Sequence, residues 1–180
     1  MTSKLKEVVI VSAIRTPIGT YKGSLKNMKS HHLGSIVIKE ALKRSKFSKE
    51  DIDEVIMGQV LTAGVGQNPA RQAAINAGIP VSKSAHIINQ VCGSGLRAVI
   101  SGFQSIKLGE STNIISGGQE NMSMAPHSIF YREEKKISTD RLFDTMINDG
   151  LIDAFNNYHM GVTAENVAKK FDISREEQDT

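Results

Sequence analysis

Cysteine is scarce in this chain and tryptophan is absent. Only one of its 180 residues is cysteine, which excludes an intrachain disulfide framework and a zinc site built on several cysteines. No run of about eighteen apolar residues occurs, so no membrane-spanning helix is expected. Residues 1–7 lack the apolar segment of a secretion signal, and an early acidic residue argues against a transit peptide. We therefore expect a cytoplasmic protein without a membrane partner.

A strong excess of one charge is also missing. The chain has 22 Lys plus Arg against 19 Asp plus Glu, which leaves a net charge of +3. It carries no dense basic block with interleaved aromatic side chains, so we expect no nucleic-acid partner. Hydrophobic residues make up 39% of the chain, which is ordinary for a globular protein that buries a core without disulfides.

Apolar runs alternate with amphipathic segments along the first 120 residues. Such alternation predicts an α/β fold, with a parallel or mixed sheet covered by helices on both faces. The clearest helix start is Asn68 followed by Pro69, a capping residue before a first-turn proline. The predicted strands are 8–14, 55–61, 85–91 and 113–116, and the predicted helices are 30–44, 69–77 and 95–108.

The pattern becomes irregular after residue 121. The charges of 132–136 indicate a solvent-exposed loop, and 142–155 contains short helices interrupted by Gly150. A helix is predicted over 163–171, and the capping box at 174–177 opens another. Because the sequence stops one turn into that helix, we expect the chain to be a part of a longer protein.

The single cysteine, Cys92, lies directly between a predicted strand and a predicted helix. Such a turn exposes a nucleophile at the carboxyl edge of a sheet, as in the nucleophile elbow of hydrolases, although the G-x-S-x-G pattern is absent. The positive end of the helix favours a thiolate, and its free amides can hold a developing oxyanion. On position and spacing alone, a small apolar side chain buried beside Val91 is an equally good interpretation.

Five segments resemble the thiolase family, and they occur in the family's order. Residues 89–98, NQVCGSGLRA, are similar to the active-cysteine motif N-x-x-C-x-S-G-x-x-A of that family. The others are RTPIG at 15–19, GVGQNPARQA at 64–73, GGQENMS at 117–123 and HMGVTAEN at 159–166.

The resemblance covers essentially the whole chain and implies a thiolase-like fold. That fold has a mixed five-stranded sheet covered by helices, with a loop domain inserted into the first of two similar domains. Residues 1–120 would then form an incomplete N-terminal domain, and residues 121–180 would begin the inserted loop domain. The C-terminal domain would be absent from this chain.

The resemblance also implies the site residues. Cys92 matches the nucleophile that receives the acyl group, with its backbone N–H in an oxyanion hole. His159 and Met160 match positions along the pantetheine arm of coenzyme A and the acyl pocket, and Leu151 is expected nearby; ordinary packing at a helix start is the alternative for this pair. No metal and no permanently bound cofactor are expected, since the coenzyme A thioester is the substrate. The family's general base and second cysteine lie outside this sequence.

The expected reaction is an acyl transfer. The chain most resembles the short-chain members, which interconvert two acetyl-CoA with acetoacetyl-CoA and CoA by ping-pong catalysis through an acyl-cysteine, and which serve lipid metabolism. A homodimer or homotetramer is expected for the complete enzyme, and this chain alone is expected to be inactive. The alternatives are a longer-chain 3-ketoacyl-CoA thiolase and a non-catalytic thiolase-like subunit.

Overall fold

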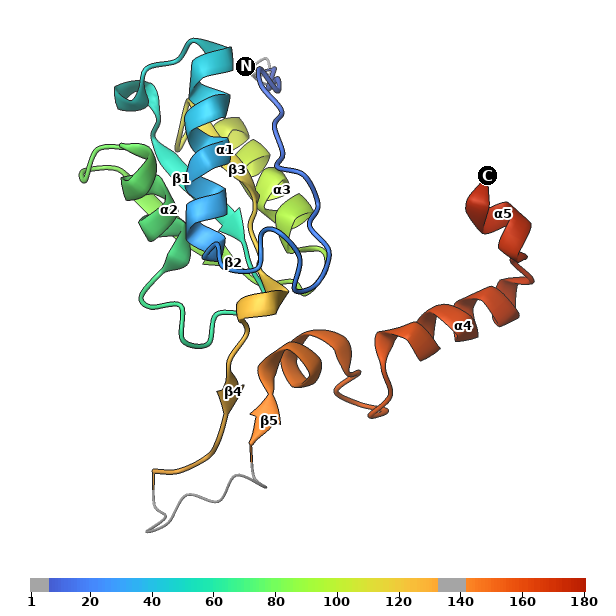
Figure 1. The fold of residues 1–180 in the computed structure, drawn as a ribbon. Coiled ribbons are helices and arrows are strands. Elements are labelled where there is room, and N and C mark those ends of the chain that lie inside the picture. The colour runs from blue at the N-terminus through green and yellow to red at the C-terminus, as the bar shows by residue number, and fades with distance from the viewer. Residues whose placement is uncertain (1–6, 133–141) are drawn as a thin grey trace. The chain divides into compact units, whose positions relative to one another are not determined.

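The computed structural model describes residues 7–132 and 142–180 (Figure 1). The chain divides after Pro126 into two compact units, Met1–Pro126 and His127–Thr180. The family resemblance predicts a boundary at residue 120, and the sequence pattern becomes irregular after residue 121.

The first unit contains a parallel sheet in the order β2-β1-β3. The central strand β1 (Glu54–Gly58) pairs on one side with β2 (Ser84–Ile88) and on the other with β3 (Ile114–Gly118). Helix α2 (Pro69–Ala77) connects β1 to β2, and α3 (Ser94–Leu108) connects β2 to β3. The predicted α/β class is confirmed. Among the described residues this sheet has three strands, which correspond to three of the four strands predicted by residue range, whereas the family resemblance implies a five-stranded sheet.

Alternate residues of β1 face opposite sides of the sheet and meet different helices. Val55 and Met57 are buried in the core that α2 and α1 (Ser30–Ser45) cover. Gly58 lies on the opposite side, against the start of α3. Four alanines of α2 at helical spacing allow α1 to approach closely, and all are buried: Ala70, Ala73, Ala74 and Ala77.

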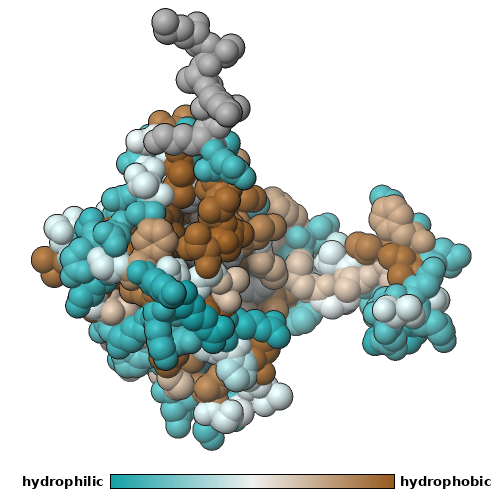
Figure 2. Space-filling view, turned by 90° about the horizontal axis from the view of Figure 1, so that it is seen from above, coloured by the Kyte–Doolittle hydropathy of each residue, from teal (hydrophilic) through white to brown (hydrophobic). Residues whose placement is uncertain are grey.

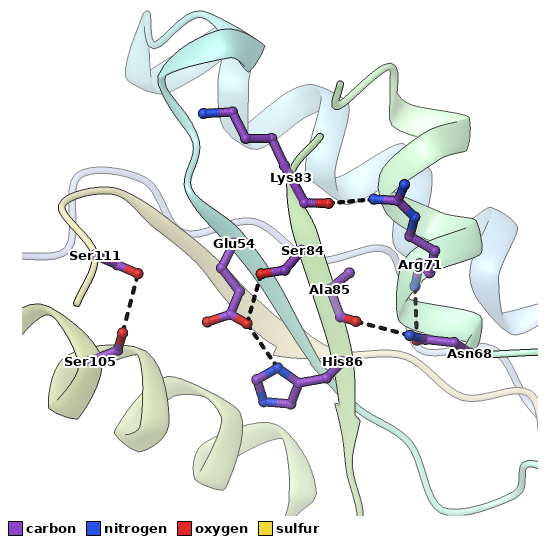
Figure 3. A network of polar contacts seen from close by, with 9 residues as sticks. All are labelled: Glu54, Asn68, Arg71, Lys83, Ser84, Ala85, His86, Ser105 and Ser111. Atoms are coloured by element: carbon purple, nitrogen blue, oxygen red, sulfur yellow. Dashed lines mark hydrogen bonds and ion pairs between the residues drawn. The ribbon is translucent and has the colours of Figure 1, made fainter. Parts of the chain in front are cut away.

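The start of α2 is held by hydrogen bonds as its sequence predicts. The Asn68 side chain accepts from the Arg71 N–H at 3.0 Å and donates to the Ala85 carbonyl at 2.9 Å (Figure 3). The Arg71 guanidinium donates to the carbonyl oxygens of Lys83 and Val81. The first turn of α2 is thereby joined to the beginning of β2.

The prediction of a buried strand at residues 8–14 is wrong. This segment forms no strand, and Val9, Ile10 and Val11 are 65%, 78% and 59% exposed. A cavity of about 640 Å³ is lined by residues 7–14, by β3 and by apolar side chains of α1 and α3. The β-branched composition suits a strand, but a strand also requires hydrogen bonds to a neighbouring strand, and residues 8–14 pair with no described strand although the outer edge of β3 is unpaired. Figure 2 shows one face of the molecule, on which hydrophobic residues gather into a patch at the surface.

Short helices complete the first unit. Ser48 and Asp51 form a capping box at η1 (Lys49–Asp51), and η2 (Met122–Met124) begins with Asn121 as its cap. Asn121 also donates from its side-chain amide to the carbonyl of Met28, at 2.6 Å. The segment after β3 is thus bound to the loop before α1.

Among its described residues, the second unit contains a two-stranded antiparallel ladder and three helices. β4 (His127–Ser128) pairs with β5 (Phe143–Asp144). The expected interruption at Gly150 is wrong, because this glycine lies inside a continuous π-helix, η4 (Met146–Leu151). The two final helices are α4 (Met160–Phe171) and α5 (Arg175–Asp179), and the predicted Ser174 capping box of α5 is confirmed.

Two further expectations concern loops and membranes. The charged loop predicted at 132–136 lies, from residue 133 onward, outside the described residues. Among the helices that the structure describes, none is long and apolar enough to cross a bilayer.

Candidate active site

Cys92 lies in the turn between β2 and α3, and its side chain is exposed. The alternative interpretation of a buried small residue is therefore wrong. Val91, directly before it, has φ 48°, in the left-handed region that β-branched residues rarely adopt. Backbone strain of this kind is held in place by the surrounding structure and gathers at functional sites.

Local hydrogen bonds close the turn around the cysteine. The Asn89 side-chain oxygen accepts from the Val91 N–H at 2.9 Å. The N–H groups of Gly93 and Ser94 donate to the carbonyls of Gln90 and Val91, at 3.0 and 3.1 Å. The turn is thus fixed on both sides of Cys92 by its own backbone.

The amide N–H and the thiol of Cys92 are both without a partner in the part of the chain that the structure describes. The N–H lies at the start of the 15-residue helix α3, where the backbone dipoles favour negative charge. A thiol beside an available amide donor can attack a carbonyl carbon while the amide binds the resulting oxyanion.

Glycines at the carboxyl edge of the sheet allow the backbone to pass directly beside this turn. A Cβ atom on Gly58 would lie 2.4 Å from the carbonyl carbon of Ser94, and one on Gly118 would lie 3.3 Å from Cα of Gly95. A Cβ on Gly117 would meet nothing within 4 Å. Close packing therefore requires glycine at 58, whereas a side chain at 118 would be tight and would need the neighbouring backbone to move slightly.

A buried polar network follows β1 and β3 at the same edge. The Gln119 side chain donates to the side-chain oxygen of Gln59 at 2.8 Å, and Gln59 donates to the Leu61 carbonyl at 2.8 Å. The Glu120 carboxylate accepts from the N–H groups of Val60 and Leu61, at 2.9 and 3.1 Å. No local pattern indicates this network beyond the GGQE motif, because the residues of β1 and β3 that it joins are about sixty positions apart.

Burial raises the pKa of Glu120, although the backbone N–H groups of Leu61, Val60 and Asn121 act in the opposite direction. A carboxyl group with a raised pKa in the fold stabilises the fold at low pH and loses that contribution as the pH rises through the raised value. Glu120→Gln keeps an acceptor oxygen without the charge. We expect this variant to gain stability relative to the unchanged protein as the pH rises through the range above about 4.5, the ordinary value of a glutamate carboxyl group.

Urea unfolding midpoints of both proteins across that range measure the difference. A stability difference that stays constant, or that favours the glutamate at higher pH, would contradict the assigned direction.

The other predicted site residues belong to the second unit. His159 is exposed and caps α4, since its Nδ1 accepts from the Gly161 N–H at 2.9 Å. Met160 is the first residue of α4 and is partly buried, and Leu151 is the last residue of η4. The start of α4 thus gives His159 a structural role as a cap, and its Nε2 remains available for another partner.

The described residues contain no group of three or more His, Cys, Asp or Glu side chains that could hold a metal ion.

The family model described as "Thiolase, N-terminal domain" matches residues 8–180. The chain belongs to the thiolase family. The resemblance carried by the five motifs is thereby confirmed.

Relatives of this thiolase chain agree with that assignment. A cytosolic acetyl-CoA acetyltransferase of Rattus norvegicus is 55% identical over 172 residues, which cover 96% of this chain and 43% of the relative. An acetyl-CoA acetyltransferase of Paracoccus denitrificans is 52% identical over 175 residues, which cover 97% of this chain and 45% of the relative. The chain thus spans less than half the length of these relatives.

A solved thiolase structure supports the fold. The crystal structure of the Bacillus anthracis acetyl-CoA acetyltransferase superposes with a TM-score of 0.87 at 37% identity, over 95% of this chain and 43% of that one. The predicted thiolase-like α/β fold is confirmed.

Proposed function

We propose that the protein transfers acetyl groups between coenzyme A thioesters and Cys92, and that the complete enzyme interconverts two acetyl-CoA with acetoacetyl-CoA and CoA. The observation that carries this is an exposed cysteine at the start of α3, beside an unused amide N–H. The names of relatives that are more than half identical to this chain support acetyl-CoA as the substrate.

In the first half-reaction, the Cys92 thiolate attacks the carbonyl carbon of acetyl-CoA. The Cys92 N–H binds the oxyanion, the bond from carbon to the sulfur of CoA breaks, and the CoA thiolate takes up the proton that the Cys92 thiol released when it ionised. In the second half-reaction, a base removes a proton from the methyl group of another acetyl-CoA, and the resulting carbanion attacks the carbonyl carbon of the acetyl-cysteine. The bond from that carbon to the Cys92 sulfur then breaks, which releases acetoacetyl-CoA and returns Cys92 as a thiolate that can take back a proton from the base. We propose that this base lies in the part of the relatives' length that the chain does not cover.

His159, Met160 and Leu151 are proposed to contact the thioester substrate. In support, His159 leaves Nε2 available, and a flexible Met side chain adapts to a small acyl group. Leu151 closes a π-helix, a conformation frequent at functional sites.

The cellular setting is part of the same proposal. We propose a cytoplasmic homo-oligomer without a metal or a permanently bound cofactor. The cytosolic name of the rat relative supports the location, and the apolar side chains exposed in this chain support further association.

The test uses the natural protein, meaning the polypeptide that contains this sequence as its source cell makes it. Treatment with acetyl-CoA should add one acetyl group at Cys92 and release one equivalent of CoA, as measured by intact mass and peptide mapping. Added CoA should remove the acetyl group again. Absence of an adduct would refute the proposal, and a faster reaction with a long-chain acyl-CoA would refute the proposed substrate.

A further inference from the structure

We infer that Ser94 is a positioning residue for the nucleophile. Its hydroxyl fixes the peptide group between Val91 and Cys92 and so aims the Cys92 N–H at the reacting carbonyl oxygen. This rests on the proposed function, because it concerns the acylation of Cys92.

The Ser94 hydroxyl bridges the two residues that precede the cysteine. The side chain is buried, with 4% of its surface exposed. Its Oγ accepts from the Gln90 N–H at 2.9 Å and donates to the Val91 carbonyl at 2.5 Å. The hydroxyl has one proton, which it donates to the Val91 carbonyl, so Oγ cannot donate a second hydrogen bond.

The Val91 carbonyl and the Cys92 N–H belong to one planar peptide group, and they point in opposite directions from it. The carbonyl end is held twice, by the Ser94 N–H and by the Ser94 hydroxyl. The N–H end makes no hydrogen bond among the described residues. Fixing the oxygen therefore fixes the direction of the one donor that stays available for an oxyanion.

The restraint by Ser94 is needed because the backbone of Val91 is strained. With φ 48°, Val91 relaxes toward ordinary backbone angles unless its neighbours prevent it. Relaxation rotates the peptide group and turns the Cys92 N–H away. Asn89, which accepts from the Val91 N–H at 2.9 Å, restrains the preceding peptide group in the same way. The buried Ser94 and the exposed Asn89 thus hold Val91 from both sides.

Ser94→Ala in the natural protein removes both side-chain bonds and keeps the backbone bond that begins α3. We expect the maximal rate of Cys92 acetylation to fall about 10- to 100-fold, because a displaced oxyanion donor costs that much. The KM for acetyl-CoA should stay within about twofold, since substrate binding is unchanged. Alkylation by iodoacetamide, which develops no oxyanion, should also stay within about threefold.

Ser105→Ala is the matched control. Ser105 lies on the same helix, is partly buried, and makes one hydroxyl bond, to Ser111 at 3.2 Å (Figure 3). It should change neither acetylation nor alkylation. Asn89→Ala is the second variant. Because Asn89 is exposed, this substitution should not prevent folding. It should also slow acetylation, by a smaller factor than Ser94→Ala.

A readout independent of activity is amide hydrogen exchange. Loss of the acceptor Oγ should speed exchange at Gln90 at least about tenfold, while the middle of α3 stays protected. If the unchanged protein is not acetylated at all, the proposed function fails. The positioning role of Ser94 is then tested only by the rate of amide hydrogen exchange at Gln90. Unchanged exchange, acetylation of Ser94→Ala at the normal rate, or an equal loss of acetylation and alkylation would each overturn the inference.

Discussion

Cys92→Ser should remove acyl transfer almost completely, with a loss of at least about 10³-fold in the acetylation rate. A serine hydroxyl stays protonated at neutral pH, and position 92 makes no hydrogen bond to a base among the described residues. The helix start can bind an oxyanion, but it cannot remove a proton from an alcohol. The measurement is the rate of adduct formation with acetyl-CoA, followed by intact mass.

The same variant should fold normally. Cys92 is exposed, and an exchange of sulfur for oxygen at the surface changes stability by about 0.5 kcal/mol or less. Thermal and urea midpoints equal to those of the unchanged protein are the control. Near-normal acetylation of the variant at any residue would show that Cys92 is not the nucleophile.

Gly58→Ala should destabilise the fold by about 3 kcal/mol, at the upper end of the range for overpacking in a core. The new methyl group would lie 2.4, 2.5 and 2.6 Å from the backbone of Ser94 and Gly95. These atoms cannot rotate away as the end of a side chain can, so α3 must shift. The urea midpoint measures the loss, and a fall in the acetylation rate should accompany it because Cys92 precedes α3.

Gly117→Ala is the matched control, since the same substitution on β3 would meet nothing within 4 Å. Its φ is not in the left-handed region, so the change should be neutral or stabilising by up to about 1 kcal/mol. Equal effects of the two substitutions would show that the close approach of β1 to α3 does not determine stability.

Local signals in the sequence were sufficient for most helices. The Asn68 cap with Pro69 and the capping box at Ser174 are present in the structure. These signals work because donor and acceptor lie within three residues of each other, so no distant part of the chain decides them.

Features that depend on distant partners could not be predicted in this way. Residues 8–14 have the composition of a strand, yet strand formation depends on an edge elsewhere in the protein. The π-helix at Met146–Leu151 continues through Gly150, where propensity favours an interruption.

The candidate site shows the same division. Cys92 was identifiable because the turn, the following helix and the family motif are all local in sequence. The left-handed backbone of Val91, the hydroxyl bridge of Ser94 and the approach of Gly58 were not, since each is a matter of geometry rather than of composition.

The order of the sheet also determines when the nucleophile takes shape during folding. The central strand begins at Glu54, and its partners in register are Ser84 and Ile114, so both pairings close long loops. Such pairings form slowly, because chain entropy is lost before any contact repays it. The turn that contains Cys92 lies between β2 and β3 in the chain, and the pairings of these strands with β1 form late. We therefore expect the thiol to acquire its reactive setting only as the sheet closes during folding.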